Sequence, residues 1–241
     1  MLKQYDFAFQ SNELDKINSE FAVKIHGIIM HNMAQNDAQR LHISKYHPFS
    51  IYCVPSNEKN IVITRVSSLS KDGDSVINSA MKLKSVPLAG ITPAKIIKYG
   101  ELSSFEYNEI SDCIRSNKLR LMFLTPSVFK IAGTETGFPD VTMHFISVIR
   151  KINEFESENI DFDNFRKIFY KCKIKKWNFK EYRYNISGRN IPGMTGFMEI
   201  ILPDNESEKN LLKKIFAYAS FSGTGARTGM GMGGFFAEGI V

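Results

Sequence analysis

The stretch FSGTGARTGMGMGGFF, residues 221–236, decides how the rest of the chain is interpreted. It holds six glycines, at positions 223, 225, 229, 231, 233 and 234, between a helical pattern and a final strand pattern. Rossmann and P-loop sites have the order strand, glycines, helix, because the helix N-terminus supplies N–H groups to the phosphate. The order here is reversed, and Thr228 stands where G-x-G-x-x-G requires its third glycine. The loop therefore does not predict nucleotide binding of either type.

Glycine has other uses at such positions. It adopts positive φ without strain and allows another backbone to approach closely, and successive N–H groups can bind an anion. Arg227 and Thr228 are suitable phosphate ligands at the middle of the loop. The alternatives are a mobile surface loop and a helix cap at Gly223. The loop residues that we expect to bind a polyanion are Gly223, Gly225, Arg227, Thr228, Gly229 and Gly231.

Periodicity upstream of the loop predicts the same plan twice. In the second half we expect strands over 118–126, 175–187, 194–202 and 233–241, helices over 140–155 and 205–221, and a short extra segment at 162–171. In the first half we expect strands over 1–10, 47–54, 60–68 and 91–102, with helices over 11–35 and 71–85. Asp140 and Asn205 are the expected caps of the two later helices. Each half has the order β-α-β-β-α-β, which is the ferredoxin-like unit.

The sequence thus predicts an α+β protein of two tandem ferredoxin-like (RRM-like) domains. An N-terminal domain spans 1–115 and a C-terminal domain spans 116–241, with the glycine-rich loop before the last strand. No low-complexity linker separates them. A chain of 241 residues with 43% hydrophobic and 23% charged residues is long enough, and apolar enough, to build such cores.

Charge and cysteine usage limit the function classes. The net charge is +6 and the pI is about 9.1, which permits a polyanionic partner without requiring one. The three cysteines are widely spaced, so we expect no disulfide framework and a reducing, cytoplasmic location. The N-terminus carries no apolar segment of the signal-peptide type, and no apolar run reaches the roughly 18 residues of a membrane span.

One stretch concentrates the positive charge. Residues 166–189 hold nine Lys or Arg and one acid, Glu181, with aromatic residues interleaved. A basic strand pair of this kind is typical of a surface that follows a phosphate backbone. A solvated hairpin with its aromatics in the core is the alternative. The basic residues expected to bind RNA are Lys173, Lys175, Lys176, Lys180, Arg183 and Arg189.

A second cluster suits acid–base chemistry. Four of the five histidines lie between residues 26 and 47. A metal-free ribonuclease uses the RNA's own 2′-OH as nucleophile, and it needs a base, an acid and a cation, for which histidine and lysine are suited. His26 lies off the apolar stripe of its helix, so we expect it to be solvated. The five-residue spacing from His26 to His31 does not suit zinc, and we expect no metal or cofactor.

The glycine loop followed by a closing strand resembles the signature loop of the RAMP superfamily of CRISPR-associated proteins. Within it, the chain resembles the endoribonucleases that cut CRISPR precursor RNA inside its repeats, the Cas-six family. Leu41-His42 followed by Phe49-Ser50 is similar to the family's catalytic histidine segment. Some members carry a catalytic tyrosine in the first helix, where this chain has Met30-His31-Asn32, so the general acid stays open.

The resemblance implies a metal-independent endoribonuclease that leaves a 2′,3′-cyclic phosphate and a 5′-OH. His42 is then the expected general base, with His31, Lys45 or His47 assisting. The implied partner is CRISPR repeat RNA, as precursor and product, with hand-over to a multi-subunit effector complex. The alternatives are a non-catalytic RAMP-type RNA-binding subunit and an RRM-type module, and the RRM aromatic string is absent from the sequence.

Overall fold

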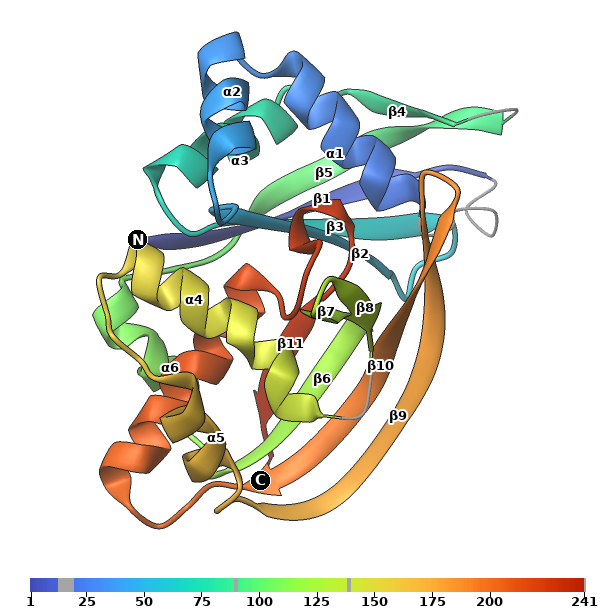
Figure 1. Cartoon of the computed structure of the whole chain (residues 1–241). Helices are drawn as coiled ribbons and strands as arrows, with labels where there is room; N and C mark the ends of the chain where they lie inside the picture. The colour runs from blue at the N-terminus through green and yellow to red at the C-terminus, as the bar shows by residue number, and fades with distance from the viewer. Residues whose placement is uncertain (13–19, 89–90, 138–139, 241) are drawn as a thin grey trace.

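The computed structural model describes residues 1–12, 20–88, 91–137 and 140–240, and these contain two large antiparallel sheets and a short two-stranded one (Figure 1). The first sheet has the strand order β2-β3-β1-β5-β4. Its strands are β1 (Leu2–Gln10), β2 (Phe49–Pro55), β3 (Ile61–Ser68), β4 (Ser85–Leu88) and β5 (Ile91–Phe105). Without the edge strand β4, this is the order of a ferredoxin-like sheet.

The helices of the first half are α1 (Glu20–Asn32), α2 (Gln35–Ile43) and α3 (Lys71–Ala80), and they lie together on one side of the first sheet (Figure 1). Alternate residues of β1 point to them, because successive side chains of a strand face opposite ways. Phe7 and Phe9 from β1 join Phe21, Ile25 and Ile29 from α1 in one buried cluster. The alternation in β1 thus positions α1.

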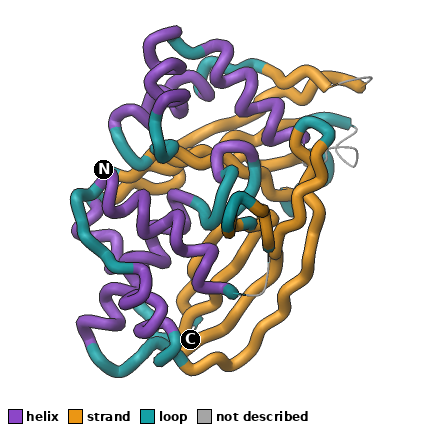
Figure 2. The backbone as a smooth tube through the Cα atoms, in the orientation of Figure 1, coloured by secondary structure: helices purple, strands orange, loops and turns teal. Residues whose placement is uncertain are grey.

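The second sheet has the order β11-β6-β10-β9, which is again the ferredoxin-like order. Its strands are β6 (Lys118–Ser127), β9 (Lys173–Ile186), β10 (Arg189–Ile201) and β11 (Phe235–Gly239). The helices α4 (Ile146–Phe155), α5 (Phe162–Phe169) and α6 (Glu206–Ser222) lie on one side of it, as the colouring by secondary structure shows (Figure 2). Short elements complete the chain: η2 (Tyr107–Cys113), β7 (Phe129–Ile131), β8 (Thr134–Thr136), η3 (Val141–Phe145) and η4 (Thr228–Met230).

The predicted α+β class with two ferredoxin-like units is confirmed. Both expected caps are present: the Asp140 side chain accepts from the N–H of Thr142, and the Asn205 side chain accepts from the N–H of Glu208. None of the described helices is long and apolar enough to cross a bilayer. The division into domains at residue 115 stays a prediction.

The structure differs from the expected elements at several points. The helices α2 and η2 and the strands β4, β7 and β8 were not predicted. Part of the first expected helix, residues 13–19, lies outside the described residues. The segment 188–192 was expected to be a connection, but β10 already begins at Arg189. A two-residue turn, Ser187 and Gly188 at φ 51° and 82°, closes the β9–β10 hairpin. Among the described pairs, β10 pairs only with β9 before Met194. Pro192 fits there because its missing N–H is not needed for a bond to a second strand.

Candidate active site

The glycine-rich loop, residues 223–234, is mostly buried between the two halves of the molecule, where it appears in red (Figure 1). Its η4 turn packs against β2 and α1. The loop is therefore not the mobile surface segment that was one alternative. It brings the second half of the chain against the histidine-rich segment of the first half.

Buried polar groups fix the first part of the loop. The ring of His144 lies 2.9 Å from the carbonyl oxygen of Gly137 through Nε2 and 2.8 Å from Oγ of Ser127 through Nδ1. Ser127 Oγ also lies 2.9 Å from Oγ1 of Thr224, and the N–H of Gly225 donates to the carbonyl of His144 at 2.8 Å. Burial lowers the pKa of His144 to about 4, so its ring is neutral and serves as a brace.

Two glycines are required by close approaches. Gly225 has φ +73°, and a Cβ there would lie 2.2 Å from the carbonyl oxygen of Val128. A Cβ on Gly229 would lie 2.8 Å from the ring of Phe49. The first glycine allows backbone to meet backbone, and the second brings η4 against an aromatic ring of β2.

Phe49 connects the loop with two histidines. The ring of His26, from α1, stacks on Phe49 with centroids 6.0 Å apart, and the ring of His47 lies 5.6 Å from it. Burial lowers the pKa of His26, and the neighbouring His47 lowers it further. A hydrogen bond with the backbone of Gly229 raises this pKa and so acts in the opposite direction. The Nδ1 of His26 is buried with no hydrogen-bond partner among the described residues. His26 was expected to be solvated, and that expectation is wrong because α1 turns this ring toward Phe49.

The other predicted catalytic residues lie around this cluster to different extents. His42 is exposed in the last turn of α2, close enough to His47 for its charge to influence the pKa of that ring. Lys45 is exposed, with Nζ 5.2 Å from the ring centroid of Tyr46. His31 is exposed in the last turn of α1, and no described contact joins it to His42 or His47. The fold thus brings His47 and His26 together on Phe49 and leaves His42 near His47, and no described contact brings His31 to them.

A buried lysine lies behind the loop. Lys151 of α4 is 5% exposed, and its Nζ donates to the carbonyl of Ser222 and to Oγ1 of Thr228, each at 2.9 Å. Partial burial lowers the pKa of His47, and the charge of Lys151 lowers it further. A hydrogen bond with the backbone of Leu41 raises this pKa and so acts in the opposite direction. His47 therefore favours its neutral form, which can accept a proton.

Comparison with known proteins points to one family. The sequence profile of the CRISPR-associated endoribonuclease Cas6 matches residues 121–235. A CRISPR-associated endoribonuclease Cas6 from Streptococcus thermophilus is 21% identical over 97% of this chain and 97% of its own length. The chain is therefore similar to Cas6 endoribonucleases.

Solved Cas6 structures have the same fold. A Cas6 product complex superposes with a TM-score of 0.79 at 20% identity, covering 99% of this chain and 100% of the other. A Thermus thermophilus Cas6 superposes with a TM-score of 0.73 at 19% identity, covering 99% and 98%. The similarity in fold therefore extends over both halves of this chain.

The basic strand of this protein is an exposed sheet edge. β9 lies at the end of the second sheet, and its predicted RNA-binding side chains are exposed: Lys173, Lys175, Lys176, Lys180 and Arg183. Lys176 lies over the ring of Phe197, with Nζ 5.7 Å from the centroid. At about 3.3 Å per residue, the 14 residues of β9 extend over roughly 45 Å from the loop. The strand is long enough to follow several nucleotides.

Two other predicted RNA ligands meet at one carboxylate. Arg227 has a left-handed backbone, φ 62°, and donates through Nε to Glu135 of β8 at 2.8 Å. Arg189, at the start of β10, lies 3.9 Å from the same carboxylate, as does Lys130. Glu135 thus links the loop to the tip of the β9–β10 hairpin. RNA contacts by Arg189 and Arg227 stay predictions.

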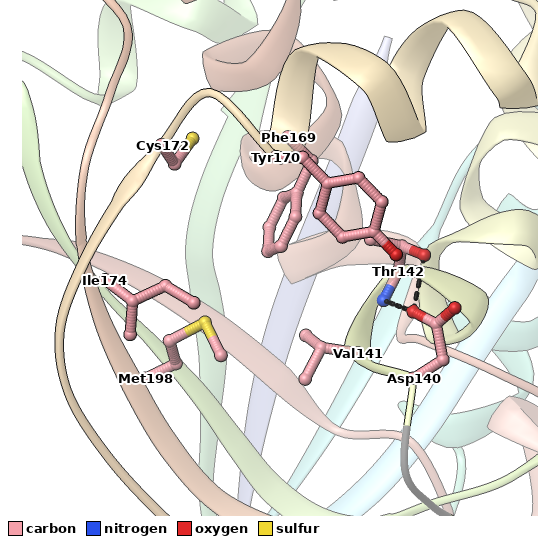
Figure 3. A pocket seen from close by; sticks show the side chains of 8 residues that line it. All are labelled: Asp140, Val141, Thr142, Phe169, Tyr170, Cys172, Ile174 and Met198. Carbon is pink, nitrogen blue, oxygen red and sulfur yellow. Dashed lines mark hydrogen bonds between the residues drawn. The ribbon is translucent and has the colours of Figure 1, made fainter.

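A hollow of about 420 Å³ lies near the start of β9, and none of the residues that line it is a histidine (Figure 3). Its lining is mainly apolar and includes Phe169, Ile174 and Met198. The carboxylate of Asp140 already accepts hydrogen bonds from Thr142 and Arg166. Because these walls offer little to a phosphate, we place the candidate site at the loop instead.

Sequence reasoning missed His26 and Lys151. Gly27 and the apolar neighbours of His26 gave no sign that its ring would pack on Phe49. Lys151 looks like an ordinary solvated lysine next to Arg150, although its place in the pattern Val148, Ile149, Ile152 was a usable signal. Those three residues are buried, and Lys151 shares their side of α4.

Proposed function

We propose that this protein is a metal-independent endoribonuclease that cleaves CRISPR precursor RNA within its repeats. The observation that carries the proposal is the cluster of His26 and His47 on Phe49 beside the glycine-rich loop, with His42 near His47. These histidines come from α1, from the segment that precedes β2 and from the end of α2. Similar solved structures include a Cas6 product complex and a Cas6 substrate mimic complex, which supports RNA as the substrate.

The proposed reaction needs three functions. A base takes the proton of the 2′-OH, and the 2′-oxygen attacks the adjacent phosphorus. The bond to the 5′-oxygen breaks, an acid protonates that oxygen, and the products carry a 2′,3′-cyclic phosphate and a 5′-OH. Histidines serve both proton transfers because imidazole titrates near neutral pH.

We assign the base to His42, which is exposed and reaches solvent from the end of α2. His47 and His26 favour their neutral forms in the free protein, as their lowered pKa values indicate. A bound phosphate brings the negative charge that this cluster lacks and favours the protonated ring of one of them, which then donates to the 5′-oxygen. Lys45 supplies a mobile cation at the mouth of the site, and the β9 lysines bind the RNA backbone.

The test uses repeat RNA incubated with the protein in EDTA, followed by analysis of the product ends. We expect cleavage in EDTA, a cyclic phosphate on the 5′ fragment, and no cleavage of RNA with a 2′-deoxy substitution at the cut site. Cleavage of the deoxy substrate, or an absolute need for Mg²⁺, overturns the mechanism. Tight binding with no product at all identifies a non-catalytic RNA-binding subunit. Hand-over of the product to an effector complex remains part of the proposal.

The residue assignment is tested with His42→Ala. The variant should bind repeat RNA with nearly unchanged affinity, because β9 holds the backbone. Its cleavage rate should fall about 10²–10⁴-fold, the usual effect of removing a positioned acid or base. His47→Ala and His26→Ala, measured in parallel, identify the acid as the variant with a comparable loss. An unchanged rate in His42→Ala removes it from the mechanism.

A further inference from the structure

Lys151 connects three parts of the candidate site from inside the protein. Its ammonium donates to the carbonyl of Ser222, at the end of α6, and to Oγ1 of Thr228, in η4. Both distances are 2.9 Å, and the side chain is 5% exposed. The loop is therefore attached at its start and at its middle to one buried cation.

This cation has no acidic partner. Among the described residues, no carboxylate lies within 4 Å of Nζ, and both acceptors are neutral oxygens. Burial lowers the pKa of Lys151 to about 7, because the charged ammonium is less favourable in this site than in water. An apolar side chain of similar length fills such a site at lower cost, so Lys151 is not explained as a stabilising residue.

Lys151 is connected to the histidine cluster through the loop. Thr228, which accepts its hydrogen bond, belongs to η4, and Gly229 of η4 packs against the ring of Phe49. The rings of His26 and His47 lie against the same Phe49, and the charge of Lys151 lowers the pKa of His47. No carboxylate of the described residues is among the groups that shift the pKa of His26, His47 or Lys151.

We infer that Lys151 is a positioning residue whose buried positive charge, acting through Thr228 and His47, holds the phosphodiester that is cleaved. The inference rests on the proposed function, because the anion is a phosphate of the bound RNA. Lys151 does not touch the RNA. It fixes η4 beneath the phosphate and provides a charge that needs no reorganisation when negative charge builds up in the transition state.

The main test compares Lys151→Met with Arg150→Met, which removes an exposed charge from the adjacent position of α4. We expect Lys151→Met to unfold at or above the wild-type temperature and to bind repeat RNA within about threefold of wild type. Its single-turnover cleavage rate should fall at least about tenfold, as a lost transition-state interaction requires. Arg150→Met should match the wild-type rate.

Thr228→Val removes the Oγ1 acceptor and keeps the side-chain shape. Because Lys151 and Thr228 act as one unit, the double variant should be no slower than the slower single variant. Fully multiplicative losses overturn the coupling through Thr228. A wild-type rate in Lys151→Met overturns the inference and leaves the proposed function in place.

A second measurement does not depend on cleavage. Calorimetry at pH 8, with 2′-deoxy repeat RNA in buffers of different ionisation enthalpy, counts the protons taken up on binding. Wild-type protein should take up a fraction of a proton that Lys151→Met does not, because a nearby phosphate favours the charged lysine. The two results are independent. Absence of RNA cleavage by the wild-type protein overturns the proposed function, and equal proton uptake by the wild-type protein and Lys151→Met overturns the inference about Lys151.

Discussion

The replacement of Gly225 by alanine tests why the loop is rich in glycine. Gly225 has φ +73°, a conformation that costs an L-residue about 1–2 kcal/mol. The new Cβ would lie 2.2 Å from the carbonyl oxygen of Val128, which is backbone and accepts a hydrogen bond from Ala226 at 2.6 Å. Relieving this overlap costs about 1–3 kcal/mol more. The variant should therefore lose roughly 2–5 kcal/mol of unfolding free energy.

Urea unfolding and thermal melting measure this loss. For a chain of this size each kcal/mol lowers the melting temperature by about 2–4 °C, so we expect a fall of roughly 4–20 °C. The matched control is Gly27→Ala on α1, where a Cβ meets nothing within 4 Å. Removing a helical glycine there should stabilise the protein by up to about 1 kcal/mol. A Gly225→Ala variant within 1 kcal/mol of wild type would falsify the steric argument.

Three further predictions follow from the same contacts. Gly229→Ala pushes on the ring of Phe49 and not on backbone, so it should lose under about 2 kcal/mol of stability while cleavage falls at least tenfold, measured by urea unfolding and single-turnover kinetics. Lys151→Met should be more stable than wild type by about 2–4 kcal/mol below pH 7, because the folded-state pKa of about 7 lies under the ordinary 10.5. This difference in stability should shrink as the pH rises from 7 to 10.5, because the lysine of the unfolded chain then loses the proton that the folded protein has already lost. Urea titrations at pH 6.5 and 9.5 measure it, and a larger difference at pH 9.5 than at pH 6.5 contradicts the assignment. Arg227→Ala should keep its fold and weaken RNA binding, and an unchanged affinity across a salt series would limit Arg227 to its ion pair with Glu135.

The repeated fold could be predicted because it depends on local periodicity. The buried alternation of β1 and the capped helix α6 give strong signals within the windows that they occupy. Helix α2 gave none, since Leu41 is its one buried residue among those described and most of its other side chains are polar. The strands of the hairpin β7–β8 are three residues each, too short for an alternating pattern.

The candidate site could be predicted only in part. His42 and His47 lie in one short segment, so the sequence already placed them together. The addition of His26 and Lys151 depends on how α1 and α4 rotate against β2 and the loop, which is tertiary packing. Of the predicted lysines, those of β9 are exposed because β9 is an edge strand, a property of sheet order that no local window contains.

The site is divided between the halves, and the two parts obey different constraints. The family profile matches residues 121–235, which include Lys151 and the loop, whereas the three clustered histidines lie between residues 26 and 47, outside that match. The sequence of the loop is constrained by backbone contacts, because a Cβ at Gly225 would overlap the carbonyl oxygen of Val128. A proton-transfer group needs only to reach the phosphate with a suitable pKa, which residues at several positions of α1, α2 or β2 can do. The part of this protein that we propose holds the phosphate is therefore more recognisable in sequence than the part that we propose performs the proton transfers.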